Sequence, residues 1–487
     1  MKAYKTFLLV LLVVAMLVGM YFLPKLSICG IDLRSVNLLA DVEADTTEVE
    51  NEGLDHEKTS VPEFVAFKDS VPDGMVAIED FKDSLGIDRE MDHFYAALDG
   101  ASDRPVRIAY FGDSFIEGDI MTAALRELLQ QEFGGCGVGF IDIKSQVAGF
   151  RTSVVELSSG WEDHNVVDAA SKGFNNALQG INGRYYLPMG LAYIDARGQQ
   201  SVYPEHLDTM QTATVFFTPE TGLSMRYSIN GGAYKPFYAS SDSIPQSVQA
   251  RKLTAKIGRI NVEVNGRGRF YGMALEGKRG IVVDNFSMRG SVGWHLGYIP
   301  QSTINDFARL RSYDLIIMHY GLNMVTPSSK GYDVYCEKFK EGIERFRKAY
   351  PETSMLIVSV TNRDSRGANG EFQTMRGVVD LVEAQKRMAQ DEHVAFWNIQ
   401  QAMGGSGSMA RMQKEGQANR DYTHINFQGG KVIGQLFFDV LMNGKMNYDH
   451  RMGKVDLSDD DNNNKVDFSH PVNLAKLKKM RVKMERK

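Results

Sequence analysis

Three short blocks of this chain carry side chains that together could cleave an acyl ester. In chain order they are Gly112-Asp113-Ser114, Gly321-Leu322-Asn323 and Asp421-Tyr422-Thr423-His424. A serine hydroxyl attacks a carbonyl group effectively when a histidine accepts its proton, and a carboxylate holds that histidine in the correct tautomer. Ser114, His424 and Asp421 supply these three groups. The blocks therefore predict an enzyme whose serine forms an acyl-enzyme.

The negative charge that develops on the carbonyl oxygen needs hydrogen-bond donors as well. The backbone N–H of Ser114 and the side-chain amide of Asn323 are the donors that the first two blocks offer. Taken singly, each block has an ordinary explanation, because Gly-Asp-Ser is often only a turn and an asparagine often begins a helix. Their joint occurrence in this order favours the enzymatic interpretation.

Predicted strands and helices place these blocks at reactive positions. Residues 107–111 have the pattern of a buried strand, and apolar residues between 120 and 133 recur at helical spacing. A turn between the two lifts the hydroxyl of Ser114 out of the sheet edge and directs the N–H groups of the helix toward negative charge. The chain lacks Gly-x-Ser-x-Gly, the turn of the ordinary α/β-hydrolases.

The alternation of strands and helices returns after residue 283. Strands are predicted at 313–319, 355–360 and 394–397, and helices at 334–350, 378–391 and about 428–442. This α/β pattern indicates a parallel sheet covered on both faces. Residues 151–282 instead carry short β patterns separated by turns such as Asn230-Gly231-Gly232. They predict a β-sandwich inserted in the α/β domain.

The combination of blocks resembles the SGNH, or GDSL, hydrolase family, which is named for a Ser, a Gly, an Asn and a His in four blocks. The resemblance covers residues 107–145 and 283–445, and the Asp precedes the His by three residues as it does in that family. It implies a flavodoxin-like, three-layer α/β domain with Ser114, Asp421 and His424 as the catalytic residues.

The family resemblance also implies a glycine N–H in the oxyanion hole. Gly290 is the candidate for this role and Gly293 is the second choice. Gly290 would act with the N–H of Ser114 and the amide of Asn323, because close approach of the backbone to a ligand is easiest without a Cβ. The family often has an Asp after the Asn, and this chain has Met324 there.

An SGNH enzyme with an inserted β-sandwich is similar to bacterial carbohydrate esterases, and among them to peptidoglycan O-acetylesterases. This resemblance implies removal of O-acetyl or other short acyl groups from an extracytoplasmic polysaccharide or peptidoglycan, without a cofactor. Two alternatives stay open. An O-acetyltransferase would use the same three residues, and a non-catalytic protein could bind the polysaccharide through the β-sandwich.

Composition and spacing exclude several other functions. The chain has 487 residues and a net charge of -6, which argues against nucleic acid as a partner. The His and Cys residues show no metal-ligand spacing, so no metal is expected. The three cysteines predict no disulfide framework. Four further candidates for a site are assigned to packing: Trp161, Trp294, His295 and His319.

The chain ends differ from the predicted domains. An uncharged apolar run at 7–23 follows Lys2 and Lys5, and it is either a cleaved signal peptide or, as we favour, a membrane anchor that leaves the rest outside the cytoplasm. The expected organisation is an anchor or signal at 1–25, an acidic tether at 26–100, a hydrolase domain at 101–150 and 283–450, an insert at 151–282 and a charged tail at 451–487.

Overall fold

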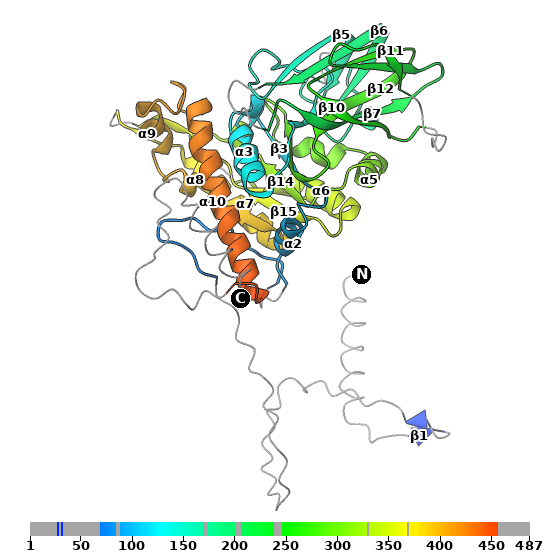
Figure 1. Cartoon of the computed structure of the whole chain (residues 1–487). Helices are drawn as coiled ribbons and strands as arrows, with labels where there is room; N and C mark the ends of the chain where they lie inside the picture. Colours follow the sequence, from blue (N-terminus) through cyan, green and yellow to red (C-terminus); the bar gives the residue numbers. More distant parts are fainter. Residues whose placement is uncertain are drawn as a thin grey trace, which may run out of the picture. The chain divides into compact units, whose positions relative to one another are not determined.

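Figure 1 shows the computed structural model of the chain. The structure describes residues 27–28, 31–32, 69–83, 88–168, 173–199, 206–237, 246–328, 331–367 and 370–455. The chain divides into two compact units, Met1–Phe64 and Val65–Lys487, and in the first unit strands β1 (Ser27–Ile28) and β2 (Ile31–Asp32) pair antiparallel. The predicted anchor at 7–23 and the predicted tail beyond residue 455 lie outside the described residues. Among the residues described, no helix is long and apolar enough to cross a membrane.

A five-stranded parallel sheet forms the centre of the second unit. Its strands, in spatial order, are β13 (Gly280–Ser287), β3 (Pro105–Gly112), β14 (Leu315–His319), β15 (Ser354–Val358) and β18 (Ala395–Trp397). In chain order this arrangement reads 2-1-3-4-5, the order of flavodoxin-like sheets. Most residues of these strands are buried, which explains why their sequences are almost continuously apolar.

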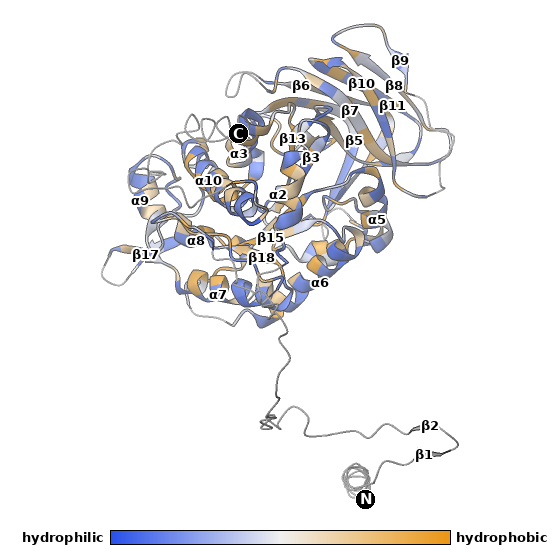
Figure 2. Cartoon of the chain, turned by 60° about the horizontal axis from the view of Figure 1, so that its bottom comes forward, coloured by the Kyte–Doolittle hydropathy of each residue, from blue (hydrophilic) through white to orange (hydrophobic). Residues whose placement is uncertain are grey.

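Helices pack on this sheet in two groups. α10 (Phe427–Arg451) contacts α2 (Asp92–Asp99) and α3 (Thr122–Phe133), while α6 (Asp333–Ala349) contacts α5 (Gln301–Leu310) and α7 (Arg376–Asp391). Figure 2 shows apolar and hydrophilic residues alternating around α6 and α7, as expected for helices with one buried face. The four helices predicted from apolar spacing are confirmed, and the last one extends to Arg451.

The chain between β3 and β13 contributes a nine-stranded antiparallel sheet. Its main path is β10 (Gln249–Ile257), β7 (Met210–Pro219), β12 (Gly268–Glu276), β6 (Arg184–Gly198), β11 (Arg259–Asn265), β8 (Ser224–Ile229) and β9 (Lys235–Pro236), with β4 (Gly139–Ile141) paired to β12 and β5 (Val154–Asn165) to β6. β12 and β6 meet at one residue pair, Phe270 with Tyr186. Side chains from both halves, such as Val215 and Val262, share one hydrophobic core.

The two halves of this sheet thus enclose a common core, which is the kind of packing that a β-sandwich has. One of its strands, β4, precedes the range 151–282 from which the sandwich is expected. Residues Val65–Lys487 form a single compact unit, so the division into a hydrolase domain and a separate insert stays a prediction.

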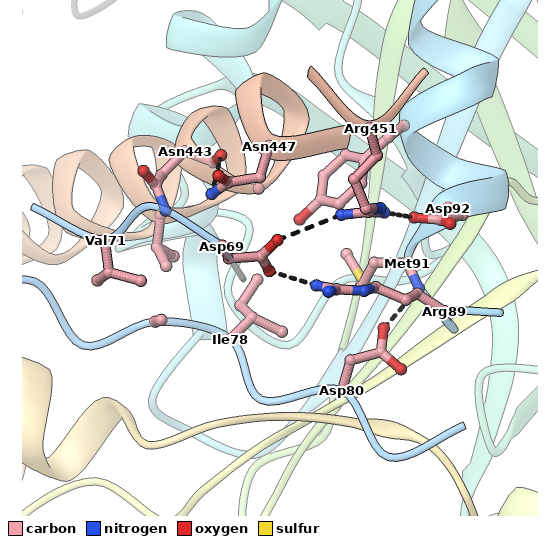
Figure 3. Close-up of a pocket in the computed structure, with 14 residues that line it drawn as sticks. Asp69, Val71, Ile78, Asp80, Arg89, Met91, Asp92, Asn443, Asn447 and Arg451 are labelled. Carbon is pink, nitrogen blue, oxygen red and sulfur yellow. Dashed lines mark hydrogen bonds and ion pairs between the residues drawn. The ribbon is translucent and has the colours of Figure 1, made fainter. Parts of the chain in front are cut away.

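The segment 69–83 belongs to the second unit and packs against its α/β part, although the sequence predicts a tether there. Asp69 pairs with Arg89 and with Arg451 near the end of α10, and Figure 3 shows these ion pairs beside a small pocket. The Glu79 N–H donates to a backbone carbonyl of β18 at 2.8 Å. The helix α2 follows this segment, also within the range 26–100.

Candidate active site

Three neighbouring strands end side by side and bring the predicted blocks together. In the sheet register, Gly112 at the end of β3 lies opposite Ser287 of β13 and His319 of β14. Ser114 follows Gly112 by two positions, and Asn323 follows His319 by four. Ligands of open α/β sheets bind at the carboxyl ends of the strands, where the strand order reverses. In this sheet that place is between β3 and β14.

Hydrogen bonds between the loops hold the three strand ends together. The Met288 N–H donates to the Gly112 carbonyl at 2.9 Å, and Asn323 Nδ2 donates to the Ser291 carbonyl at 2.9 Å. A Cβ on Gly112 would lie 2.8 Å from the Ile116 side chain, so the close packing of this turn requires glycine. The loops after β3, β13 and β14 therefore form one connected surface.

Ser114, His424 and Asp421 form one hydrogen-bonded chain at this surface. His424 Nε2 lies 2.9 Å from Ser114 Oγ, and His424 Nδ1 lies 2.7 Å from Asp421 Oδ2. With its proton on Nδ1, the imidazole donates to Asp421, and Nε2 remains to accept the serine proton. The structure thus brings together the three side chains that the sequence proposes as nucleophile, base and orienting carboxylate.

The histidine and its carboxylate belong to a loop between α9 (Ser408–Lys414) and α10. Asp421 Oδ1 accepts from the backbone N–H groups of Thr423 and His424, each at 3.0 Å. Tyr422 between them has a φ of 54°, which is uncommon for a residue other than glycine. Its ring stacks on Phe372 with centroids 3.8 Å apart. Sequence reasoning missed Phe372, because nothing in the sequence relates these two loops.

The side-chain amide of Asn323 has two contacts, one with the residue before Ser114 and one with the loop after β13. Nδ2 donates to the Ser291 carbonyl at 2.9 Å and lies 3.5 Å from Asp113 Oδ2. The first hydrogen bond fixes the plane of the amide. The second contact is long, so an oxygen of a substrate could compete for this N–H.

The two glycines considered for the oxyanion hole have different surroundings. Gly290 is exposed, has a φ of 78°, and a Cβ on it would meet only Val167 at 3.5 Å. Gly293 is buried with a φ of 88°, and a Cβ there would lie 2.4 Å from the ring of Phe339. Packing therefore explains Gly293, whereas Gly290 stands on an open loop after β13 where its N–H could face a ligand.

The two carboxylates of the site have pKa values shifted in opposite directions. Burial raises the pKa of Asp113 to about 6, against the lowering effects of the Phe115 N–H and of His424. Partial burial also raises the pKa of Asp421, but hydrogen bonds from His424 and Thr423 outweigh it and hold the pKa below its usual value. Asp421 is therefore the carboxylate that stays ionised beside the imidazole.

A buried ion network lies in the segment after the turn of Ser114, and no sequence pattern predicted it. Asp119 is fully buried with a φ of 63° and pairs with Arg126 and Arg151. Burial raises the pKa of Asp119, but the two guanidinium groups dominate and lower it well below its usual range. Arg126 belongs to α3, and Arg151 leads into β5. The network thus joins the turn to the antiparallel sheet.

The residues assigned to packing from the sequence have structural surroundings. His319 is buried 3.1 Å from the Tyr110 hydroxyl, and burial lowers its pKa to about 3. Trp161 and His295 are buried as well, and the half-buried Trp294 lies under the Lys338 ammonium group. Across the described ranges, no group of three His, Cys, Asp or Glu side chains is arranged to hold a metal ion.

Comparison with known proteins finds likeness in structure. No family model and no curated protein sequence matches the chain. A solved peptidoglycan O-acetylesterase structure matches with a TM-score of 0.63 at 18% identity, covering 76% of this chain and 99% of that one. A GDSL-like lipase from Parabacteroides merdae matches with a TM-score of 0.25 at 9% identity, over 34% of this chain and 73% of that one. A family two carbohydrate esterase from Cellvibrio japonicus matches with a TM-score of 0.23 at 7% identity. This match covers 61% of this chain and 99% of that one.

The first of these matches extends over nearly the whole length of the O-acetylesterase. It shows that this chain shares the fold of that protein, and the centre of this fold is the 2-1-3-4-5 parallel sheet. The mixed α/β fold with a parallel sheet that the sequence predicts is thereby confirmed.

Proposed function

We propose that this protein is a serine esterase that removes O-acetyl groups from an extracytoplasmic polysaccharide or peptidoglycan through an acyl-enzyme. The observation that carries the proposal is the chain from Ser114 Oγ through His424 to Asp421, with separations of 2.9 and 2.7 Å, at the carboxyl ends of the sheet. These distances allow proton transfer from the hydroxyl to the imidazole without rearrangement.

The reaction follows from this geometry. Ser114 Oγ attacks the ester carbonyl while His424 Nε2 takes its proton, and Asp421 stabilises the resulting imidazolium. The carbonyl oxygen becomes negative and accepts hydrogen bonds from the Asn323 amide and from the N–H groups of Ser114 and Gly290. His424 then gives its proton to the leaving alcohol. A water molecule, activated by the same histidine, hydrolyses the acyl-enzyme.

Exposure of the base favours hydrolysis over transfer to a second sugar. The side chains of His424 and Asp421 are 36% and 47% exposed, so water reaches the imidazole that must activate it. A transferase using the same residues has to keep water from its acyl-enzyme. This openness makes the O-acetyltransferase the second choice.

The substrate class and the location rest on the shared fold. The matched peptidoglycan O-acetylesterase is superposable over 99% of its length, so we extend its class of substrate to this chain. A substrate in the cell envelope agrees with an anchor at 7–23 that would hold the enzyme outside the cytoplasm. The antiparallel sheet would then hold the polymer near the catalytic surface.

The deciding experiment measures acetate release by the full chain from a small aliphatic acetyl ester, acetylated xylan and O-acetylated peptidoglycan. Wild-type protein should release acetate, and the Ser114→Ala variant should lose on the order of 10⁶-fold in kcat. Ser159→Ala, which alters an exposed serine of β5, is the matched control and should keep full activity. Activity that survives in Ser114→Ala, or a folded wild type that releases no acetate, would reject the esterase.

A further inference from the structure

Phe150 lies beside the catalytic surface with its ring partly open to solvent. The side chain is 46% exposed, and its ring packs against Phe427 with centroids 5.1 Å apart. Phe427 is the first residue of α10 and follows His424 by three positions. Single exposed apolar side chains are common in proteins, so exposure alone carries no meaning. A function is indicated by the position of this ring and by the residues that pack against it.

The chain leaves space for the Phe150 ring at Gly118, in the segment that follows Ser114. Gly118 follows Ser114 by four positions, and a Cβ on Gly118 would lie 2.5 Å from the Phe150 ring. Any other residue at 118 would push the ring away. Gly118 also has a φ of 61°, which glycine adopts without strain. The turn of Ser114 and the ring of Phe150 are therefore fitted to each other.

The backbone of Phe150 is anchored although its ring is exposed. Its N–H donates to the Val147 carbonyl at 2.8 Å. The next residue, Arg151, is fixed by ion pairs of 2.9 Å with both Asp119 and Glu156. A ring held in this way loses little conformational entropy when a ligand covers it. Such preorganisation is typical of a binding surface.

The chemistry of the site indicates which part of the ester meets this ring. The carbonyl oxygen must lie toward Asn323, and the leaving alcohol must lie toward His424, which returns the proton. Phe150 contacts the element that follows His424, so it stands on the side of the leaving alcohol. In a carbohydrate ester that alcohol is a sugar, and the C–H groups of a pyranose ring form an apolar patch that can pack on an aromatic face.

We propose that Phe150 is a substrate-binding residue that stacks on the sugar ring bearing the ester. This inference rests on the proposed esterase function and names the subsite for its leaving group. The contributions of the sugar ring and the acyl group can be measured separately, because a small aliphatic acetyl ester carries the acyl group but no sugar ring. Loss of the Phe150 ring should then weaken binding of acetylated sugars alone.

The test compares Phe150→Ala with wild type on acetylated xylan, O-acetylated peptidoglycan and a small aliphatic acetyl ester. The expected result is a rise in KM of about 3- to 10-fold for the polymers, with unchanged kcat and an unchanged small-ester reaction. Phe150→Trp should restore the KM. Val167→Ala is the matched control, since Val167 is an apolar side chain of similar exposure, at 47%, that lies beside Gly290. Its effect should be equal on all three substrates.

A binding measurement separates this inference from the esterase function. In the Ser114→Ala background, calorimetry with acetylated xylo-oligosaccharides and O-acetylated peptidoglycan fragments should show affinity that falls about 3- to 10-fold when Phe150→Ala is added. Equal affinity with and without the ring, or no binding of either ligand by the parent, would overturn the subsite. Equal losses on polymers and small ester would also overturn it. Failure of wild type to release acetate would instead reject the esterase, and the binding result would still decide the role of Phe150.

Discussion

The two sides of the candidate active site are built in different ways. On the nucleophile side, Ser114 and Asn323 follow adjacent strands of the parallel sheet, and Asp113 beside them is only 2% exposed. On the base side, Asp421 and His424 stand on a loop and are 47% and 36% exposed. The sheet therefore fixes the proposed nucleophile and the proposed oxyanion donor, while short-range hydrogen bonds within the loop fix the proposed base.

This difference also appears in the electrostatics. Burial raises the pKa of Asp113 to about 6, whereas hydrogen bonds hold the pKa of the more accessible Asp421 below its usual value. An ionised group next to the imidazole stabilises the imidazolium. Burial thus dominates the electrostatics on the nucleophile side, and hydrogen bonding dominates them on the base side.

Among the tests of this comparison, the largest effect is expected from a substitution of Asp421 on the base side. In Asp421→Asn the side-chain oxygen can keep the N–H bonds from Thr423 and His424, but the new amide donates toward Nδ1 and favours the wrong tautomer. Acetate release should fall by up to about 10⁴-fold in kcat, with little change in KM or in melting temperature. The control is Asp195→Asn, which removes a surface ion pair of the antiparallel sheet. A loss of less than about tenfold would assign Asp421 a purely structural part.

An intermediate effect is expected on the nucleophile side. Asn323→Ala removes the amide that binds the Ser291 carbonyl and is placed to bind the oxyanion. Deleting one donor of an oxyanion hole lowers kcat by about 10²- to 10³-fold, and steady-state kinetics should show this loss with KM nearly unchanged. If KM rises while kcat stays constant, Asn323 binds the ground state and is no oxyanion donor.

The smallest expected effect is a pH dependence of the free energy of unfolding, and it tests the raised pKa of Asp113. Because the folded pKa of Asp113 is raised from 3.8 to about 6, the folded protein holds a proton between about pH 4 and pH 6 that the unfolded chain has lost. The free energy of unfolding therefore decreases as the pH rises through this window. The shift corresponds to about 3 kcal/mol.

Asp113→Asn removes this titration while keeping an oxygen for the Phe115 N–H. We expect denaturant unfolding to show that the free energy of unfolding of the variant, relative to that of wild type, is about 3 kcal/mol higher at pH 7 than at pH 4. In Asp421→Asn the sign should be reversed and the pH window should be lower, because the folded pKa of Asp421 lies below 3.8 and its stabilisation of the wild type is lost only as the pH falls below about 4. Parallel curves for wild type and Asp113→Asn between pH 4 and pH 7 would contradict the raised pKa of the buried Asp113.

Local signals explain what could be predicted from the sequence. Helices α3, α6, α7 and α10 have regular apolar spacing, and four of the five parallel strands are short apolar runs that the sequence pattern locates. The strand β13 was not predicted. The three catalytic candidates were identifiable because their blocks keep a fixed order, although only the fold shows that they meet. The sheet register explains why the first two blocks lie close together, because Gly112 at the end of β3 is paired with His319 at the end of β14.

Features that depend on distant contacts could not be predicted. β5 and β12 contain register shifts near Gly160 and Tyr271, which interrupt the alternation that marks a strand in the sequence. The contact of Phe372 with Tyr422 joins two loops whose approach depends on the whole fold. The raised pKa of Asp113 likewise follows from burial, which no motif encodes.

The ion network of Asp119 joins the α/β part to the antiparallel sheet, so the two parts cannot be exchanged independently. Arg151 and Ser153, which both bind Asp119, lie directly before β5 of the antiparallel sheet, while Arg126 on α3 completes the network from the α/β side. A shortened chain without 151–282 would leave a fully buried carboxylate with fewer donors, directly behind the catalytic turn. The antiparallel sheet and the active site are therefore expected to be inherited, and to change, together.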